Sequence, residues 1–187
     1  MIDTLSSRED KIYIVVTQTG TILSRMLKAI TRASYNHVSL TLDPTLTAIY
    51  SFGRKNPYNP FIGGFVLESP HFGTFRRFSE TEAVVLEISV TEEQKRLIED
   101  RLTEMYINRH DYTYNTLGLL LASLRIHYQP ERSYYCSEFV RDILKEFNVV
   151  SPTDLPSIPE PIQFLKLSSV REIYRGKLRK FPRLQFN

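Results

Sequence analysis

The chain has 187 residues, of which 42% are hydrophobic and 22 are Phe or Tyr, with a net charge of +3 and one cysteine. This length and composition favour one domain covering residues 1–187, with a substantial core, and exclude a disordered chain. The longest apolar run, LGLLLASL at 117–124, is far shorter than the ~20 residues of a membrane-spanning helix, and a lone cysteine forms no internal disulfide.

The two ends of the chain give expectations about location and partners. The N-terminal stretch MIDTLSSREDKIYIVV has charged residues where a secretory signal needs a basic start followed by an uninterrupted apolar run, so we expect a cytoplasmic protein. The basic tail at 171–183 is expected to be a solvated end, with peripheral contact to anionic lipid as the alternative. No motif for specific nucleic-acid recognition is recognised, so no nucleic-acid partner is expected. The sequence does not address the oligomeric state.

The first elements along the chain read as strand, helix and hairpin. KIYIVVTQ at 11–18 is almost continuously apolar and predicts a buried strand, and the apolar spacing at 21–32 predicts an amphipathic helix. NHVSLTLD at 36–43 alternates, with His37 on its polar face, and TLTAIYSFG at 45–53 continues in the same style after the Asp-Pro turn. A β-hairpin follows from this pattern.

The middle of the chain mixes irregular and regular patterns. Residues 54–73 are rich in Pro, Gly and Asn and predict a long surface loop, either a ligand-gripping cover or a structural flap. GTFRRFS at 73–79 and AVVLEISV at 83–90 are interpreted as strands. Thr91 and Gln94 form a capping-box pattern that predicts a helix ending near residue 107.

The last third is predicted to be largely helical. Helices are expected over 114–124 and 133–147, and a last amphipathic segment over 161–174. The proline-rich SPTDLPSIPEP between the last two predicts an irregular segment. Helices and antiparallel strands alternate without a βαβ rhythm. The predicted class is therefore α+β, a small antiparallel sheet or partial barrel packed against helices.

Cys136 has two interpretations that the sequence leaves open. It begins an apolar stripe with Phe139, Val140, Ile143 and Leu144, and a buried free cysteine needs no further explanation. It also falls in the first turn of the predicted helix, with Ser133 as the expected N-cap, where the helix dipole favours a thiolate.

A nucleophilic cysteine needs a base, and His37 is the best of the four histidines because a strand would hold its ring firmly. The other three, His71, His110 and His127, lie in predicted loops. If the hairpin turns at 43–45, His37 faces Ser51, which we therefore predict to orient the imidazole.

YNHVSL near the N-terminus and YYCSEFV about a hundred residues later resemble the two signatures of the permuted papain-like amidases. That family belongs to the NlpC-type cysteine peptidase superfamily and is related to the lecithin:retinol acyltransferases. The resemblance implies a permuted papain-like fold, with Cys136 as nucleophile, His37 as base and a polar residue on the next strand as the third member. Many relatives carry a carboxylate at that last place, where this chain has Ser51.

The chemistry implied is a thioester acyl-enzyme formed at Cys136. The Cys136 N–H at the helix start is one expected oxyanion donor, and Gln18, Tyr134 and Tyr135 are candidates for the second. The expected function is an amidase or peptidase acting on a small amide or peptide. The alternatives are an acyltransferase or lipid hydrolase, and a non-catalytic binding protein that retains the fold. Without HExxH or CxxC spacing or a glycine-rich phosphate loop, we expect neither metal nor cofactor.

Overall fold

The computed structural model describes residues 9–19, 35–56 and 59–182, and the helix expected at 21–32 lies outside these ranges. Its central element is a six-stranded antiparallel sheet with the strand order β4-β3-β2-β1-β5-β8. The strands are β1 (Glu9–Gln18), β2 (His37–Thr41), β3 (Ile49–Asn56), β4 (Asn59–Glu68), β5 (Glu82–Thr91) and β8 (Val170–Lys177). The class is therefore α+β, as the sequence predicted.

Helices and two short strands complete the described part of the chain. They are α2 (Gly73–Arg77), α3 (Glu92–Ile107), β6 (Thr113–Tyr114), α4 (Thr116–Ala122), β7 (Ser133–Tyr134), α5 (Cys136–Glu146), η1 (Pro161–Lys166) and η2 (Leu178–Lys180). β6 and β7 pair in parallel and form a separate two-stranded sheet. Because β7 leads directly into α5, this small sheet fixes the place where that helix begins.

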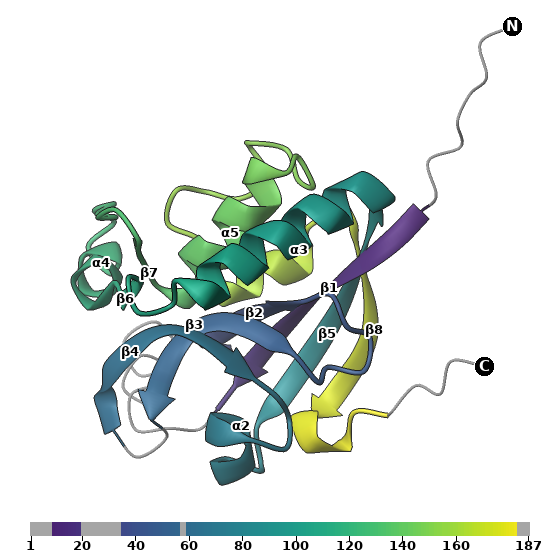
Figure 1. The fold of residues 1–187 in the computed structure, drawn as a ribbon, viewed down its shortest axis with the longest axis horizontal. Coiled ribbons are helices and arrows are strands. Elements are labelled where there is room, and N and C mark those ends of the chain that lie inside the picture. The colour runs from purple at the N-terminus through teal and green to yellow at the C-terminus, as the bar shows by residue number, and fades with distance from the viewer. Residues whose placement is uncertain (1–8, 20–34, 57–58, 183–187) are drawn as a thin grey trace, which may run out of the picture.

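The helices α3 and α5 cover one face of the sheet, while α2 lies near its lower edge (Figure 1). Two hydrophobic clusters follow from this arrangement. The larger one joins α3 and α5 to the sheet through side chains such as Ile14, Phe52 and Phe139. The smaller one lies on the other face and contains Val15 and Phe75. Alternate residues of β1 therefore enter different clusters, which explains why that strand is almost continuously apolar.

Strand β1 confirms the strongest sequence prediction. It pairs with β2 on one side and with β5 on the other, and the Thr17–His37 pair brings the start of β2 to the end of β1. The predicted strand at 83–90 is likewise present as β5. A central strand buried on both faces needs an apolar side chain at nearly every position, and this is the pattern that the sequence carries.

Strand β4 corrects the prediction of a long loop at 54–73. It is the edge strand of the sheet, so only one side of it needs ladder hydrogen bonds, and its proline is tolerated for that reason. Its glycines also serve packing, since a Cβ at Gly63 would lie 2.8 Å from the Cβ of Tyr114. The Pro and Gly content that indicated a loop is therefore compatible with a strand at this edge.

Two further predictions were wrong because the same residues suit another element. GTFRRFS does not form a strand: its first five residues form α2, where Phe75 packs into the smaller cluster. The segment 161–174 is not one helix, since η1 ends at Lys166 and β8 then pairs with β5. Much of the basic tail is therefore sheet, and its cations make ion pairs such as Arg171 with Glu87 at 2.8 Å.

Helix α3 begins where the capping box predicted. The Thr91 side chain accepts from the Gln94 N–H at 3.1 Å, and the Gln94 side chain accepts from the Thr91 N–H at 2.9 Å. Its buried residues are Ile98, Leu102 and Met105. Two of the initially unpaired N–H groups of the helix are thus satisfied within its own sequence, which is why the boundary was predictable.

The remaining helices are shorter than predicted. Helix α4 starts at Thr116, because Asn115 caps it by accepting from the Gly118 N–H at 2.8 Å. Helix α5 starts at Cys136, and Ser133 is not its N-cap but a residue of β7 paired with Thr113. The proline-rich segment between α5 and η1 contains neither helix nor strand, as predicted.

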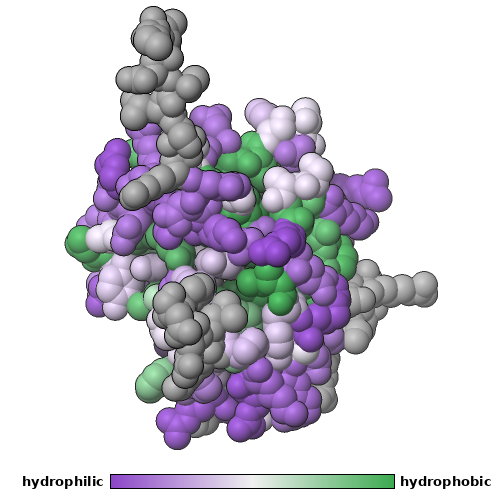
Figure 2. Space-filling view, turned by 90° about the vertical axis from the view of Figure 1, so that its right-hand side faces the viewer, coloured by the Kyte–Doolittle hydropathy of each residue, from purple (hydrophilic) through white to green (hydrophobic). Residues whose placement is uncertain are grey.

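Figure 2 shows one face of the molecule, with hydrophilic residues over much of it and hydrophobic ones between them. Among the described helices, none has both the length and the apolar composition required to cross a membrane. The larger exposed apolar side chains include Leu117, Leu120 and Leu124 of α4 and the turn after it. Much of the apolar run at 117–124 is therefore exposed rather than buried in the core.

Candidate active site

The start of β2 and the start of α5 bring His37 and Cys136 together. Each residue is the first of its element, so both lie where an element begins. Helix α5 packs against β2 and β3, and its apolar stripe keeps Cys136 only 4% exposed. The features behind both interpretations of Cys136 are therefore present together: the residue belongs to the core, and it also stands at a helix N-terminus.

Charge couples the two side chains. Burial on its own raises the pKa of the Cys136 thiol, but the charge of His37 and a hydrogen bond from it lower that pKa below its usual value. Backbone N–H groups of Val38 and Ser137 also donate to the sulfur and lower its pKa further. The charge of His37 and the first turn of α5 thus both stabilise the thiolate relative to the thiol.

The imidazole responds in the opposite sense. Burial lowers the pKa of His37, whose side chain is 15% exposed, but the negative charge of Cys136, their hydrogen bond and Glu68 together raise the pKa to about 10. An imidazolium paired with a thiolate is the arrangement that activates a cysteine nucleophile. The pair lies in a setting with little water, where such an interaction is stronger than at the surface.

Ser51 contacts His37, but not in the predicted register. The Leu40–Tyr50 pair of β2 and β3 places Ser39, and not His37, opposite Ser51 in this antiparallel ladder. Ser51 Oγ nonetheless lies 3.1 Å from His37 Nε2, and its hydroxyl donates to the Val38 carbonyl at 3.3 Å.

The register differs because the hairpin turn is wider than the predicted 43–45. The Asp43 carboxylate accepts from the backbone N–H groups of Thr45 and Thr47 at 2.7 and 2.8 Å, and from their hydroxyls as well. Leu46 completes the turn in the left-handed region, with φ of 58°. A shift by two residues keeps every side chain on its predicted face, which is why Ser51 still reaches the imidazole diagonally.

Glu68 is a candidate site residue that the sequence analysis missed. Its Oε2 lies 3.4 Å from His37 Nε2, on the same nitrogen that contacts Ser51, and its side chain is 6% exposed. It ends β4, the strand that was interpreted as loop. Its signal in the sequence was the short alternation FVLE, in which Val66 and Glu68 share a face, and the surrounding Pro and Gly residues concealed it.

A carboxylate beside Nε2 stabilises the imidazolium by charge, which a hydroxyl does not. Two acceptors therefore fix the ring on the side of Nε2: Ser51 by a neutral hydrogen bond, and Glu68 by a longer but charged one. The ring is further enclosed by Phe75 of α2, with ring centroids 6.4 Å apart. These contacts hold the imidazole in one orientation toward the sulfur.

The three side chains that the sequence suggested as second oxyanion donor lie in different parts of the fold. Tyr134 packs in the core with its ring centroid 5.0 Å from that of Phe52, and Tyr135 is 2% exposed at the N-cap of α5. Gln18 ends β1 directly after Thr17, the partner of His37. The N–H groups in the first turn of α5 have no acceptor within the helix and are next to Cys136 in the chain. They are therefore the donors best placed to bind an oxyanion.

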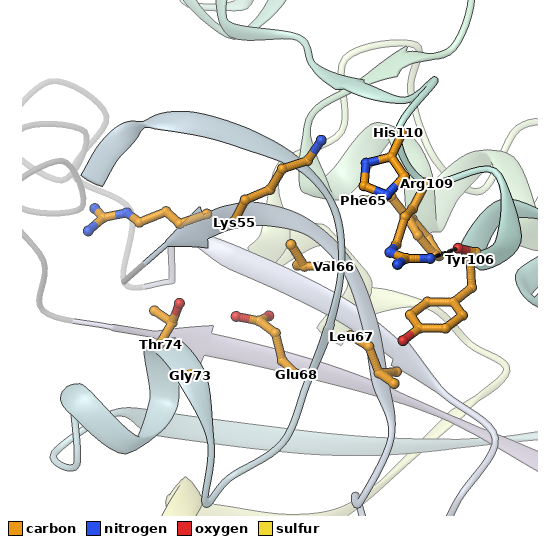
Figure 3. A pocket seen from close by; sticks show the side chains of 11 residues that line it. Lys55, Phe65, Val66, Leu67, Glu68, Gly73, Thr74, Tyr106, Arg109 and His110 are labelled. Carbon is orange, nitrogen blue, oxygen red and sulfur yellow. Dashed lines mark hydrogen bonds between the residues drawn. The ribbon is translucent and has the colours of Figure 1, made fainter. Parts of the chain in front are cut away.

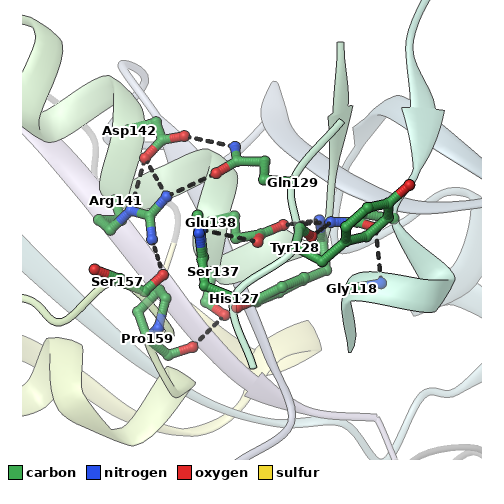
Figure 4. Close-up of polar contacts among 12 residues, drawn as sticks. Gly118, His127, Tyr128, Gln129, Ser137, Glu138, Arg141, Asp142, Ser157 and Pro159 are labelled. Atoms are coloured by element: carbon green, nitrogen blue, oxygen red, sulfur yellow. Dashed lines mark hydrogen bonds and ion pairs between the residues drawn. The ribbon is translucent and has the colours of Figure 1, made fainter. Parts of the chain in front are cut away.

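A buried carboxyl supports the start of α5. Glu138 Oε2 accepts from the Tyr135 N–H at 3.0 Å and from Asn115 Nδ2 at 3.2 Å. Asn115 Nδ2 also donates to the Tyr128 carbonyl at 2.7 Å (Figure 4). The Glu138 side chain is fully buried, and burial raises its pKa to about 7 against these hydrogen bonds. This network ties α4 and the turn after it to the helix that carries the sulfur.

A second polar cluster fixes the outer side of α5. The Arg141 guanidinium contacts Asp142 at 2.6 Å, Gln129 Oε1 at 3.0 Å and the Ser157 carbonyl, while the Ser137 hydroxyl donates to the Pro159 carbonyl at 2.7 Å (Figure 4). The irregular proline-rich segment is thereby held against α5 by side chains rather than by a ladder. The cluster fixes the position of the helix that presents Cys136.

The other histidines do not contact Cys136 as His37 does. His127 Nε2 lies 3.9 Å from Glu138 Oε1, His110 lines a cleft beside Glu68, and His71 is exposed. In the described residues no cluster of three or more His, Cys, Asp or Glu side chains is arranged to hold a metal ion.

No protein-family model matches the sequence, and no curated protein matches it either. Any assignment of function therefore depends on the geometry of the residues themselves.

Proposed function

We propose that the protein is a cysteine hydrolase, an amidase or peptidase, in which Cys136 is the nucleophile and His37 is the general acid and base. The observation that carries this proposal is geometric: the largely buried side chains of His37 and Cys136 form a hydrogen bond with each other, which lowers the pKa of Cys136 and raises that of His37. Paired shifts of this kind are typical of catalytic groups.

The chemical steps follow from the protonation states. The Cys136 thiolate attacks the carbonyl carbon of an amide, forming an S–C bond and a tetrahedral oxyanion, which the N–H groups at the start of α5 stabilise. The C–N bond then breaks as the His37 imidazolium gives its proton to the leaving amine. Water attacks the resulting thioester while neutral His37 accepts a proton, and the acid product leaves as the thiolate–imidazolium pair re-forms.

Glu68 and Ser51 are proposed to orient His37 through Nε2, and Glu68 also to stabilise its positive charge. This assigns the third place of the site to a carboxylate, the residue type that many permuted papain-like amidases carry, although Glu68 lies on β4 and not on the strand that follows His37. The order of the elements agrees with that family as well, since the strand that carries the histidine precedes the helix that carries the cysteine. The permuted papain-like fold is part of this proposal.

The test uses the chain's single cysteine. Alkylation of the native protein by iodoacetamide reports Cys136 alone, and intact mass gives the rate at each pH. We expect fast alkylation at pH 5–6, where a thiol with the ordinary pKa of about 8.5 is almost unreactive. A rate that rises only near that pH, or that requires denaturant, would refute the nucleophile and favour a structural thiol. A screen of acyl amides, with Cys136→Ala as control, then tests turnover.

A further inference from the structure

A cleft of about 360 Å³ borders the proposed site at Glu68. Its polar lining consists of Arg54, Lys55, Glu68, Thr74, Arg109 and His110. Figure 3 shows Lys55, Arg109 and His110 on one side of the space, with Glu68 and Thr74 on the other. We call this space the Glu68 cleft. Glu68 lines this cleft and also contacts His37, since Glu68 Oε2 lies 3.4 Å from His37 Nε2.

The Glu68 cleft has an excess of positive charge. Its one carboxylate, Glu68, faces the His37 imidazolium, so its charge is already matched. In the described part of the chain, the ion pairs do not include Arg54, Lys55, Arg109 or His110. Burial and the charge of Arg77 both lower the pKa of Arg54, so this cation lies in an unfavourable setting that a bound anion would relieve.

A glycine of the edge strand lets Lys55 enter the cleft. Lys55 lies at an irregularity of the β3–β4 ladder: it is the one residue of β3 between the pairs Arg54–Gly63 and Asn56–Asn59, and the extra residues lie on β4. The side chain of Lys55 then crosses β4 over Gly64, where a Cβ would lie 2.8 Å from the ammonium nitrogen. Gly64 thus makes the room that this cation uses to pass the edge strand.

The guanidinium of Arg109 is also held in place. Arg109 donates from Nη1 to the Tyr106 carbonyl at 3.0 Å and lies over the Tyr106 ring, 4.9 Å from its centroid. His110 follows it directly in the chain and lines the same space. Cations from β3 and from the end of α3 therefore converge on one cavity beside the base, and their geometry is fixed by separate elements.

We propose that the Glu68 cleft binds an anionic group, a carboxylate or a phosphate, of the substrate processed at Cys136. The inference depends on the proposed function, since it assigns a substrate class to that site. Guanidinium and ammonium groups around a partly enclosed cavity are the usual partners of such oxyanions. The substrate class is then an acyl amide with a negative charge a short distance from its scissile carbonyl.

Binding is tested without chemistry, by titrating Cys136→Ala protein with inorganic phosphate and, separately, with glutarate, and following backbone amide shifts by NMR. We expect saturable shifts at the ends of β3 and β4, and the tighter ligand identifies the anion. Lys55→Gln should weaken binding about fivefold, because one partly exposed charge contributes about 1 kcal/mol. Lys166→Gln, an exposed lysine of η1, is the matched control and should change nothing. Equal effects of the two variants, or shifts confined to β8, would overturn the proposal.

Turnover is tested with glutaryl p-nitroanilide and its uncharged methyl ester. We expect kcat/KM about fivefold higher for the charged substrate, a preference that Lys55→Gln reduces to within a factor of about two and Lys166→Gln leaves intact. Equal turnover of the two substrates would refute the anion site but would still support the proposed hydrolase function. Anion binding at the cleft with an inert Cys136 would refute the hydrolase, and with it the substrate assignment.

Discussion

Replacement of Glu68 by Gln tests how the base is held. The variant keeps the shape of the side chain and removes the charge that lies 3.4 Å from His37 Nε2. Both side chains are largely buried, so solvent screening reduces this interaction less than it reduces a surface pair. We expect the thiolate–imidazolium pair to weaken from both sides: the pKa of His37 falls, and the pKa of Cys136 rises because part of its counter-charge is lost.

The magnitude follows from the contact. A hydrogen bond to a charged group contributes about 1.5–3 kcal/mol, and one pKa unit corresponds to about 1.4 kcal/mol. The acidic limb of the alkylation profile should therefore move up by about one to two pH units. Loss of the imidazolium at high pH leaves a thiolate that iodoacetamide still alkylates, so the shift is expected on the acidic side alone.

The assay is the pH dependence of iodoacetamide alkylation of native protein, read by intact mass. Glu99→Gln, an exposed position of α3, controls for a general change in net charge. Ser51→Ala removes a neutral hydrogen bond of about 1 kcal/mol and should move the acidic limb less. An unchanged profile in Glu68→Gln would refute the role of the carboxylate, and a larger shift in Ser51→Ala would restore the serine as the orienting residue.

Three stability predictions follow from the packing around the site. The pKa of Glu138 is raised to about 7, so the folded state holds more protons than the unfolded state between about pH 4.5 and 7, and stability falls as pH rises through that window. Glu138→Gln should therefore reduce this pH dependence, and its free energy of unfolding in urea at pH 8 should exceed that of the unsubstituted protein by about 2–3 kcal/mol. An unaltered pH dependence of the free energy of unfolding would contradict the buried carboxyl. Gly118→Ala should cost more than about 2 kcal/mol by the same measurement, because its Cβ would overlap the capping Asn115 side chain, and a neutral effect would contradict that close packing. Phe52→Ala should cost about 3–5 kcal/mol, whereas the 70% exposed Phe72→Ala should cost little, and similar losses would contradict the assignment of the core.

The parts of the fold that were predicted correctly carry their signals locally. Thr91 and Gln94 satisfy each other's backbone N–H groups, so the start of α3 requires no knowledge of the rest of the chain. The parts that were wrong depend on neighbours. The glycines of β4 indicate a loop in isolation, but they face Tyr114 and Lys55 across an edge strand, where small residues are needed. GTFRRFS likewise becomes a helix because Phe75 packs beneath the sheet.

The candidate site divides in the same way. Cys136 and His37 were recognisable because a cysteine at a helix start and a histidine at a strand start each stand out within a few residues of sequence. Ser51 was reached from the polar face of its strand, although the register differed by two residues, because such a slip preserves the face. Glu68 was not predicted, since its contact with the imidazole spans 31 residues and depends on a strand that was not recognised.

The sequence by itself determined which side chains are apolar at helical or strand spacing, and hence that β1, α3 and α5 contribute to a core and that one thiol lies in the first turn of a helix. Only the tertiary structure decided which charges meet that thiol. Periodicity describes how a segment lies against a nonspecific apolar surface, whereas a pKa depends on individual charges a few ångströms away. Those charges come from strands and turns far apart in the chain, and their meeting is a property of the assembled sheet.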